Sequence, residues 1–285
     1  MCRLFGLTAG AARVHATFWL LDAPDSLEAQ SLRNVDGSGI GFFDPFGAAV
    51  LDKQPEPAFA DEEFVHEARQ AESATFVAHV RLASTGGRTL ENTHPFAMQG
   101  SVMAHNGGFG ELDRLDAQLG SHASLVLGDT DSERYFALII QQADAHGGDL
   151  GAGITAAARW IAARLPVSSL NTIVVTPGEL WALRYPDQHA LHIIERPAGP
   201  GQDPAARPGL HARSATSSFH VPALHAAPSV VVASERLDGE SGWRMLAPGE
   251  LVHVGPGLSV RSEVVLPEPP ARLVPIGPGN PNIDT

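Results

Sequence analysis

Positive charge and cysteine are both scarce in this sequence. Its 285 residues include one cysteine, 19 basic residues and 32 acidic residues, which gives a formal net charge of −13. A single cysteine excludes an intramolecular disulfide framework and a metal site built from several cysteines. A strongly acidic chain repels nucleic acid and anionic membrane surfaces, so we expect neither as a partner.

Long apolar runs are also missing. No stretch approaches the roughly 20 residues that are needed to span a bilayer. The N-terminus lacks the basic start, the apolar stretch and the small-residue cleavage site of a signal peptide. Hydrophobic residues make up 44% of the chain and charged residues 18%, which is typical of a globular protein. We therefore expect a cytoplasmic protein with one large domain or two small ones.

Short β-rich runs alternate with helical patterns. Apolar, β-branched or aromatic runs bounded by turn residues predict strands at 2–9, 37–43, 74–84, 101–106, 170–176, 179–185, 190–195, 229–234, 249–255 and 258–265. Apolar residues repeating with helical spacing predict helices at 25–32, 61–70, 129–145 and 154–165. The order of strands, two helices and further strands predicts two sheets between helix layers.

Two segments are rich in proline and glycine. Residues 196–228 have the composition of an irregular surface insertion, and residues 266–285 that of a tail with little to bury. We therefore predict one domain over 2–265 that carries this insertion, followed by the C-terminal tail.

The position of Cys2, directly after Met1, raises the first question of function. If Met1 is removed, as the small side chain of Cys2 favours, one residue carries both a thiol and a free α-amine. Their ordinary pKa values are about 8.5 and about 7.7–8.0, so both titrate near neutral pH. The amine can take the thiol proton through a water molecule and leave a reactive thiolate. Cys2 is therefore a candidate nucleophile, although a small buried residue in a strand is the ordinary interpretation.

Arg81 ends an apolar strand and is followed by small hydroxyl and glycine residues. Its guanidinium, with Ser84 and Thr85 just beyond it, is suited to clamp a carboxylate with two hydrogen bonds. A surface arginine paired with a neighbouring acid would give the same pattern. We retain Arg81, Ser84 and Thr85 as candidate substrate-binding residues.

Another short strand runs into Asn106, Gly107 and Gly108. The side-chain amide of Asn106 and the N–H of Gly107 would stabilise an oxyanion if they pointed at one spot. The same residues are also a strong signal for a hairpin turn. Asn106 and Gly107 are therefore candidates for catalysis, and the turn remains the alternative.

Acidic and histidine residues complete the set of candidates. Asp131, near the start of the helix predicted at 129–145, would either accept hydrogen bonds from a substrate ammonium group or cap the helix, as Asp129 could also do. We expect His94 to order the segment around it and His105 to be a satisfied strand-end histidine, without a catalytic role for either.

In chain order, Cys2 and the segments RLAST, ENTHPF, HNG and DTDSE resemble the motifs of class II glutamine amidotransferases. The later segments TPGELWALRY and VVVASERLDGESGWRMLAPGELVHV are similar to the distal strands of stand-alone members, so the resemblance spans about residues 2–265. It implies an α+β fold, namely the four-layer α-β-β-α sandwich of the N-terminal nucleophile hydrolases.

The resemblance also implies the catalytic roles. Cys2 would be the nucleophile, its own α-amine the base, and Asn106 with Gly107 the oxyanion hole. The implied reaction is hydrolysis of the side-chain amide of glutamine or of a γ-glutamyl conjugate, through a γ-glutamyl thioester on Cys2. This scheme requires neither a metal nor an organic cofactor.

Substrate binding follows from the same resemblance. Arg81 would bind the α-carboxylate of the substrate, with Ser84 and Thr85 lining the pocket beside it, and Asp131 would bind the α-amino group. These two charged residues match the zwitterionic end of glutamine. Biosynthetic members usually have Trp directly after the arginine and a His-Gly pair shortly beyond it. Those places hold Leu82 and a Thr-Gly pair here, which brings the chain closer to stand-alone members such as the γ-glutamyl amidohydrolase of the ergothioneine pathway.

Other functions remain open from the sequence. The chain could be a glutaminase subunit that delivers ammonia to a separate synthase partner, because the residues after 265 cannot hold a synthase active site. It could also be a non-enzymatic binding protein in which Met1 is retained. An amidase of the bile-salt or penicillin acylase kind is disfavoured, since those acyl groups have no α-amino acid end for Arg81 and Asp131 to bind.

Overall fold

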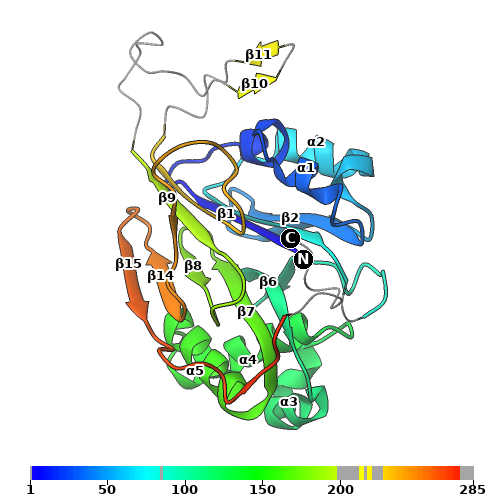
Figure 1. Ribbon diagram of the computed structural model, residues 1–285, viewed down its shortest axis with the longest axis vertical. Coiled ribbons are helices and arrows are strands. Elements are labelled where there is room, and N and C mark those ends of the chain that lie inside the picture. Colours follow the sequence, from blue (N-terminus) through cyan, green and yellow to red (C-terminus); the bar gives the residue numbers. More distant parts are fainter. Residues whose placement is uncertain (1, 84–85, 198–211, 215–216, 220–226, 277–285) are drawn as a thin grey trace.

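Two sheets lie face to face, and helices cover the outer face of each sheet (Figure 1). This computed structural model describes residues 2–83, 86–197, 212–214, 217–219 and 227–276. The layer order of helix, sheet, sheet and helix confirms the predicted α+β sandwich. The predicted site residues Ser84 and Thr85, most of the predicted insertion and the end of the predicted tail lie outside the described residues.

The first sheet begins the chain and contains the earliest motifs. Its described strands, in spatial order, are β13 (Arg244–Met245), β9 (His192–Arg196), β12 (Ser229–Ala233), β1 (Arg3–Thr8), β4 (Thr75–Arg81), β2 (Gly37–Phe43) and β3 (Ala49–Gln54). All neighbouring strands in this sheet are antiparallel. β1 and β4 therefore run side by side near the middle of the sheet.

The second sheet carries the later motifs. Its described strands, in spatial order, are β15 (Val260–Val264), β14 (Glu250–Val254), β8 (Leu180–Leu183), β7 (Pro166–Val175), β6 (Ser101–Phe109) and β5 (Phe96–Met98). A short strand, β16 (Arg272–Leu273), pairs with the start of β7 in parallel. A separate pair of strands is formed by β10 (Ala212–Ser214) and β11 (Ser217–Phe219).

Helices pack on both outer faces (Figure 1). On the first sheet lie the π-helix η1 (Phe18–Asp22), α1 (Leu27–Ser31), the 3-10 turn η2 (Ala58–Ala60) and α2 (Glu62–Gln70). On the second sheet lie α4 (Asp131–Ala145) and α5 (Leu150–Arg164), and α3 (Leu112–Leu119) with the 3-10 segment η3 (Gly120–Leu125) packs against α4. The predicted helices are present, whereas η1 and α3 were not predicted from the sequence.

The inner faces of the two sheets share an apolar core made mostly of β-branched side chains. The sheets approach closely at Gly6 of β1, where an added Cβ would lie 2.8 Å from Cγ2 of Ile173 in β7. A side chain at position 6 would push the sheets apart, so glycine permits the contact. This close packing brings the ends of β1 and β4 toward β6, where the functional motifs lie.

The start of the predicted tail is attached to the domain. Leu266 is buried, the Ala271 N–H donates to the Ala162 carbonyl at 2.9 Å, and the Val274 N–H donates to the Val167 carbonyl at 2.8 Å. The segment from 266 to 276 therefore packs against α5 and β7. The sequence pattern did not predict this, because β16 is only two residues long and its pairing is non-local.

Candidate active site

The thiol of Cys2 is held by the backbone of the neighbouring strand. β1 pairs with β4 so that Arg3 lies opposite Val80, which places Cys2 beside Arg81 and the residue after it. The Leu82 N–H donates to Cys2 Sγ at 3.2 Å, and the thiol donates to the Leu82 carbonyl at the same distance. The half-buried Cys2 therefore has a fixed side chain at the start of a central strand.

Burial raises the pKa of the Cys2 thiol, and the Leu82 hydrogen bond and the positive charge of Arg81 offset only part of this effect. The resting sulfur therefore retains its proton near neutral pH. A cysteine in this environment needs a base before it can act as a nucleophile, since the thiolate is the reactive form.

Arg81 is buried, not on the surface, with only 3% of its area exposed. Its guanidinium donates to the carbonyls of Gly87 at 3.0 Å and Gly86 at 3.4 Å. Burial lowers the pKa of Arg81, while the negative charges of Asp36 and Asp131 oppose that shift. The interpretation of Arg81 as an exposed arginine is therefore wrong.

The loop after β4 is tied down on its other side by Asp36. The carboxylate of Asp36 accepts the Ala83 N–H at 2.7 Å and pairs with Arg88. These contacts hold the backbone next to Leu82, and therefore the groups that contact the Cys2 thiol.

Asn106 and Gly107 lie within β6 and not in a turn. They pair with Asn171 and Leu170 of β7, so the hairpin alternative is wrong. Within the described residues, the buried Nδ2 of Asn106 has no hydrogen-bond partner. An unpaired buried donor costs about 1–3 kcal/mol. Asn106 is thus a donor that lacks an acceptor in the structure, as an oxyanion hole requires before substrate binds.

Glycine is required at position 107 by the neighbouring strand. An added Cβ would lie 2.0 Å from the Ser169 carbonyl oxygen and 2.8 Å from Nε2 of His105. Any side chain would displace β6 from β7 at the point where Asn106 is placed.

Asp131 is the first residue of α4, but it does not cap the helix. Thr130 is the N-cap, and its hydroxyl accepts the Glu133 N–H at 3.2 Å, so the predicted capping by Asp129 or Asp131 is wrong. Oδ2 of Asp131 instead accepts the Phe109 N–H at 3.2 Å. The helix N-terminus also favours a negative charge at this position.

Cys2, Arg81, Gly107 and Asp131 line one small cavity of about 20 Å³, together with Leu82, Ala83, His94, His105, Thr130 and Ser132. This volume holds about one water molecule, so the groups around it lie within reach of a single small reacting centre. Four of the described candidates therefore converge from four elements, namely β1, β4, β6 and the start of α4, while Asn106 is not among the residues that line the cavity.

Two polar residues that support this cavity were missed by sequence reasoning. Asn92 donates to the Gly87 carbonyl at 3.3 Å and accepts the Asp129 N–H at 2.7 Å, so it links the Arg81 loop to the start of α4. Ser132 bonds to His105 at 2.9 Å. Position was the only sequence signal that could have identified these two residues. Asn92 lies in the ENTHPF segment, and Ser132 directly follows Asp131.

The histidines have distinct environments. Both ring nitrogens of His105 are hydrogen bonded, which confirms that it is a satisfied histidine. His94 lies against His79, with ring centroids 4.2 Å apart and the ring planes tilted by 35°. Burial lowers the pKa of His79 to about 3 and that of His94 well below its usual value, so both are neutral near pH 7.

The described residues include no group of three or more His, Cys, Asp or Glu side chains that could hold a metal ion.

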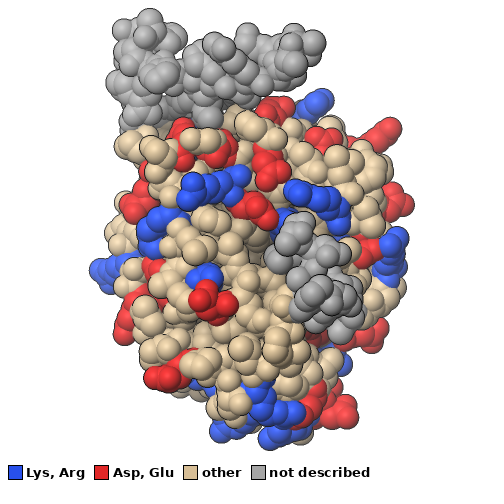
Figure 2. Space-filling model, in the orientation of Figure 1, with Lys and Arg blue, Asp and Glu red and all other residues tan. Residues whose placement is uncertain are grey.

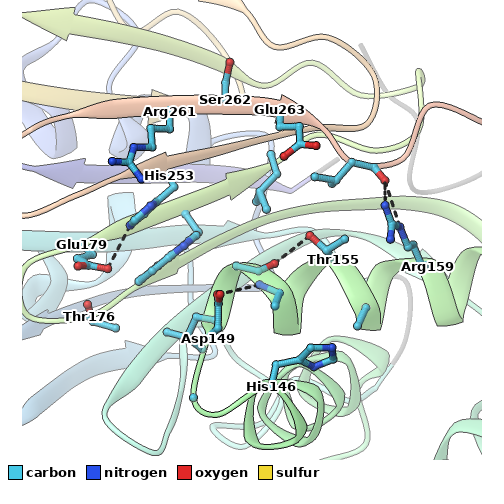
Figure 3. A pocket seen from close by; sticks show the side chains of 18 residues that line it. His146, Asp149, Thr155, Arg159, Thr176, Glu179, His253, Arg261, Ser262 and Glu263 are labelled. Atoms are coloured by element: carbon cyan, nitrogen blue, oxygen red, sulfur yellow. Dashed lines mark hydrogen bonds and ion pairs between the residues drawn. The ribbon is translucent and has the colours of Figure 1, made fainter.

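A larger cavity of about 950 Å³ lies at the other end of α4 (Figure 3). His253 stacks on Trp181 with ring centroids 4.7 Å apart and bonds to Glu179 at 3.1 Å. Figure 3 shows Arg261 and Glu263 of β15 pointing toward this cavity. Cys2, Arg81 and Asp131 do not line it. Because α4 has 15 residues and a helix rises 1.5 Å per residue, the two cavities are about 22 Å apart along it.

Figure 2 shows acidic and basic side chains interspersed over one face of the molecule, around a central area with few charges. Within the described residues, no helix has the length and apolar character that crossing a membrane requires.

The fold is shared with solved structures of low sequence identity. An allosteric regulatory enzyme of purine biosynthesis aligns with 94% of this chain and 50% of its own chain, at 20% identity and a TM-score of 0.63. A glutamine aminotransferase class-II domain protein from Silicibacter pomeroyi aligns with 93% of this chain and 100% of its own, at 18% identity and a TM-score of 0.58. This chain thus spans half of the first structure and all of the second.

Sequence comparison identifies nearer relatives. The gamma-glutamyl-hercynylcysteine sulfoxide hydrolase of Mycobacterium tuberculosis is 30% identical over 89% of this chain and 93% of its own length. The putative glutamine amidotransferase YafJ of Escherichia coli is 26% identical over 75% of this chain and 83% of its own. The family model described as glutamine amidotransferases class-II matches residues 1–270. With this match over most of its length, the chain belongs to the class-II glutamine amidotransferases and is an amide-hydrolysing enzyme.

Proposed function

We propose that this protein hydrolyses the side-chain amide of glutamine or of a γ-glutamyl conjugate, with Cys2 as the nucleophile. The observation that carries the proposal is the convergence of Cys2, Arg81 and Asp131 on one cavity, from elements far apart in sequence. A thiol can attack the side-chain amide of an amino acid substrate. A cation and a carboxylate can bind its α-carboxylate and its α-ammonium group. The relative from Mycobacterium tuberculosis, a hydrolase by name, supports the γ-glutamyl class.

The reaction begins with proton transfer from the Cys2 thiol. After removal of Met1, the α-amine of Cys2 accepts this proton, which the buried thiol would otherwise retain. The thiolate then forms a bond to the amide carbon, and the carbonyl oxygen becomes an oxyanion. Asn106 Nδ2 and the Gly107 N–H donate to this oxyanion.

Collapse of this intermediate breaks the carbon–nitrogen bond. The protonated α-amine returns its proton to the departing nitrogen, which leaves as an amine or as ammonia, and a γ-glutamyl thioester remains on Cys2. Water then loses a proton to the same amine and attacks the thioester carbon. The products are glutamate and the free thiol, so each turnover restores the starting state.

Binding of the amino acid end uses two opposite charges that line the same cavity. The guanidinium of Arg81 binds the α-carboxylate, as bidentate pairing favours. The carboxylate of Asp131 accepts hydrogen bonds from the α-ammonium group. Ser84 and Thr85 complete the pocket beside Arg81 in this proposal.

The test is a screen for glutamate release from glutamine and from a series of γ-glutamyl amides, with the intact mass of the protein measured in parallel. We expect release from at least one substrate, loss of Met1, and a covalent adduct of one glutamine-mimicking electrophile on Cys2. Retained Met1, or no glutamate from any substrate, would refute the proposal. Glutaminase activity that rises only with a stable partner chain would instead indicate a subunit that delivers ammonia.

A further inference from the structure

The backbone of Cys2 lies just before the first strand of the sheet. Strand β1 begins at Arg3, so Cys2 is not itself part of that strand. The thiol of Cys2 is held by the N–H and the carbonyl of Leu82. These contacts fix the sulfur, but they do not fix the torsion about the Cα–C bond of Cys2. That torsion sets the direction of the α-amine relative to the carbonyl group.

The side chain of Arg3 holds the carbonyl of Cys2. Nη1 of Arg3 donates to the Cys2 carbonyl oxygen at 3.3 Å, and Nη2 lies 3.0 Å from Oε1 of Glu235. Arg3 is only 3% exposed, whereas the side chain of Glu235 is 46% exposed. A buried guanidinium costs free energy unless it is paired and hydrogen bonded, so both contacts favour this placement of Arg3.

The place of Glu235 is set by pairing between distant segments. Glu235 follows β12, and Ser234 directly before it forms two hydrogen bonds with Leu4. The Leu4 N–H donates to Ser234 Oγ, and the Ser234 N–H donates to the Leu4 carbonyl, both at 3.0 Å. Leu4 and Ser234 are 230 residues apart in the chain. The carboxylate that pairs with Arg3 is therefore supplied by the tertiary structure.

The charge of Arg3 acts on the α-amine that Cys2 carries after removal of Met1. The amine nitrogen is three bonds from the carbonyl oxygen, so the bonded guanidinium nitrogen lies within roughly 7 Å of it. A like charge at this distance disfavours the protonated amine, and the carboxylate of Glu235 opposes that effect. Both charges therefore influence how much of the amine is neutral and able to accept the thiol proton.

Other charged or titratable groups surround Cys2 and Arg3 from several elements. They are the thiol of Cys2 itself, Arg81 of β4 with Asp36 beside it, Asp131 of α4, Arg33 and Asp25 near Arg3, and His189 between β8 and β9. Burial lowers the pKa of His189 to about 4, so this ring is neutral near pH 7. All these groups remain when Arg3 or Glu235 is replaced, so a difference between variants reports the replaced charge.

We propose that Arg3 positions the α-amine of Cys2 through the Cys2 carbonyl, and that Arg3 and Glu235 together set the pH range in which this amine acts as the base. This inference rests on the proposed function and deepens it, because it assigns supporting residues to the base of the reaction. Arg3 and Glu235 are positioning residues, since neither contacts the substrate in the reaction scheme. A purely structural role predicts lower stability and turnover with an unchanged pH dependence.

The experiment measures kcat/KM for glutamate release from glutamine, or from the γ-glutamyl amide that is cleaved best, between about pH 5 and pH 9. The acidic limb of this profile reports the base of the free enzyme. Arg3→Met removes the positive charge, which makes the amine easier to protonate. The limb should therefore move to higher pH by roughly 0.5–1 pH unit. Glu235→Gln removes the negative charge and should move the limb to lower pH by a similar amount.

Two further variants separate geometry from charge. Arg3→Lys retains the charge but loses the planar fork that contacts both oxygens, so kcat should fall about tenfold while the limb moves by less than about 0.2 pH unit. Glu240→Gln is the matched control for Glu235→Gln. Glu240 is 39% exposed and pairs with Arg196, which lies opposite Ser229 at the other end of β12. This control should leave both the limb and kcat unchanged.

Thermal melting and the intact mass of each variant verify folding and the removal of Met1. Because Glu235 is half-exposed, its substitution keeps the inference testable even where a variant of the buried Arg3 fails to fold. A limb that stays at the wild-type pH in Glu235→Gln, or that moves in the same direction in Arg3→Met, would overturn the shared role in pH dependence. An unchanged kcat in Arg3→Lys would overturn the positioning role. A wild type that releases no glutamate from any substrate would instead refute the proposed function.

Discussion

The two sheets contribute different chemistry to the same cavity. The first sheet supplies the thiol of Cys2 and the guanidinium of Arg81 from adjacent strands, β1 and β4. The second sheet supplies Gly107, next to Asn106 in β6, and the start of α4 supplies Asp131. The thiol and the cation thus come from the first sheet. The neutral amide groups come from the second sheet, and the carboxylate comes from the helix that covers it. The site therefore exists only when both sheets pack against each other.

The largest expected effect belongs to the first sheet. Cys2→Ala should abolish glutamate release, because no other group in the reaction scheme forms the covalent intermediate. The fold should persist, since the lost side chain is small and half-buried. Turnover is measured as glutamate release and folding by thermal melting; wild-type turnover in a fully folded Cys2→Ala would contradict the assignment of the nucleophile.

The next effect tests the second sheet. Asn106→Ala should lower kcat by ~10²–10³ with a much smaller change in KM, because an oxyanion donor acts mainly in the transition state. The matched control is Asn171→Ala, since Asn171 lies directly opposite on β7 and bonds to Tyr185, His189 and Ala190 instead. The control should lose stability and retain kcat. Equal losses of kcat in the two variants would show that Asn106 acts only through the strand pairing.

A smaller effect distinguishes binding from chemistry in the first sheet. Arg81→Lys should raise KM for the substrate about tenfold to a hundredfold, because a lysine ammonium cannot form the bidentate contact, while kcat falls less. Arg184→Lys is the control, since Arg184 is similarly buried and bonds to His189, Leu246 and Asp187. An unchanged KM in Arg81→Lys would remove this residue from substrate binding.

The smallest effect concerns the N-cap of α4, the helix that begins with Asp131. Thr130→Ala removes the N-cap of α4 and should cost about 1 kcal/mol of unfolding free energy, with a modest rise in KM because Asp131 is the next residue. Thr155→Ala, in the interior of α5, removes a hydroxyl that bonds to Gly151 and caps nothing. It should cost less than Thr130→Ala in chemical denaturation and should leave KM unchanged. The reverse order would contradict the assignment of Thr130 as the cap.

Much of the fold could be predicted because the local signals are strong. The helical spacing around Tyr135 and the β-branched runs such as 229–234 identified α4 and the central strands. Errors arose where a local motif had two meanings. Asn106 and Gly107 were also compatible with a turn, and pairing with β7 decided for a strand. Asp131 was compatible with a cap, and the threonine before it takes that role.

The reactive groups could be identified from the amino-acid order alone: one cysteine at position 2, an arginine at the end of a strand, and an aspartate at the start of a helix. That order could not determine that Arg81 is buried, that Nδ2 of Asn106 lacks an acceptor among the described residues, or that Ser132 is hydrogen bonded to His105. Those facts depend on contacts between residues far apart in the chain. Only the packing of the two sheets brings these residues together, because side-chain pKa values and hydrogen bonds depend on the neighbours that folding supplies.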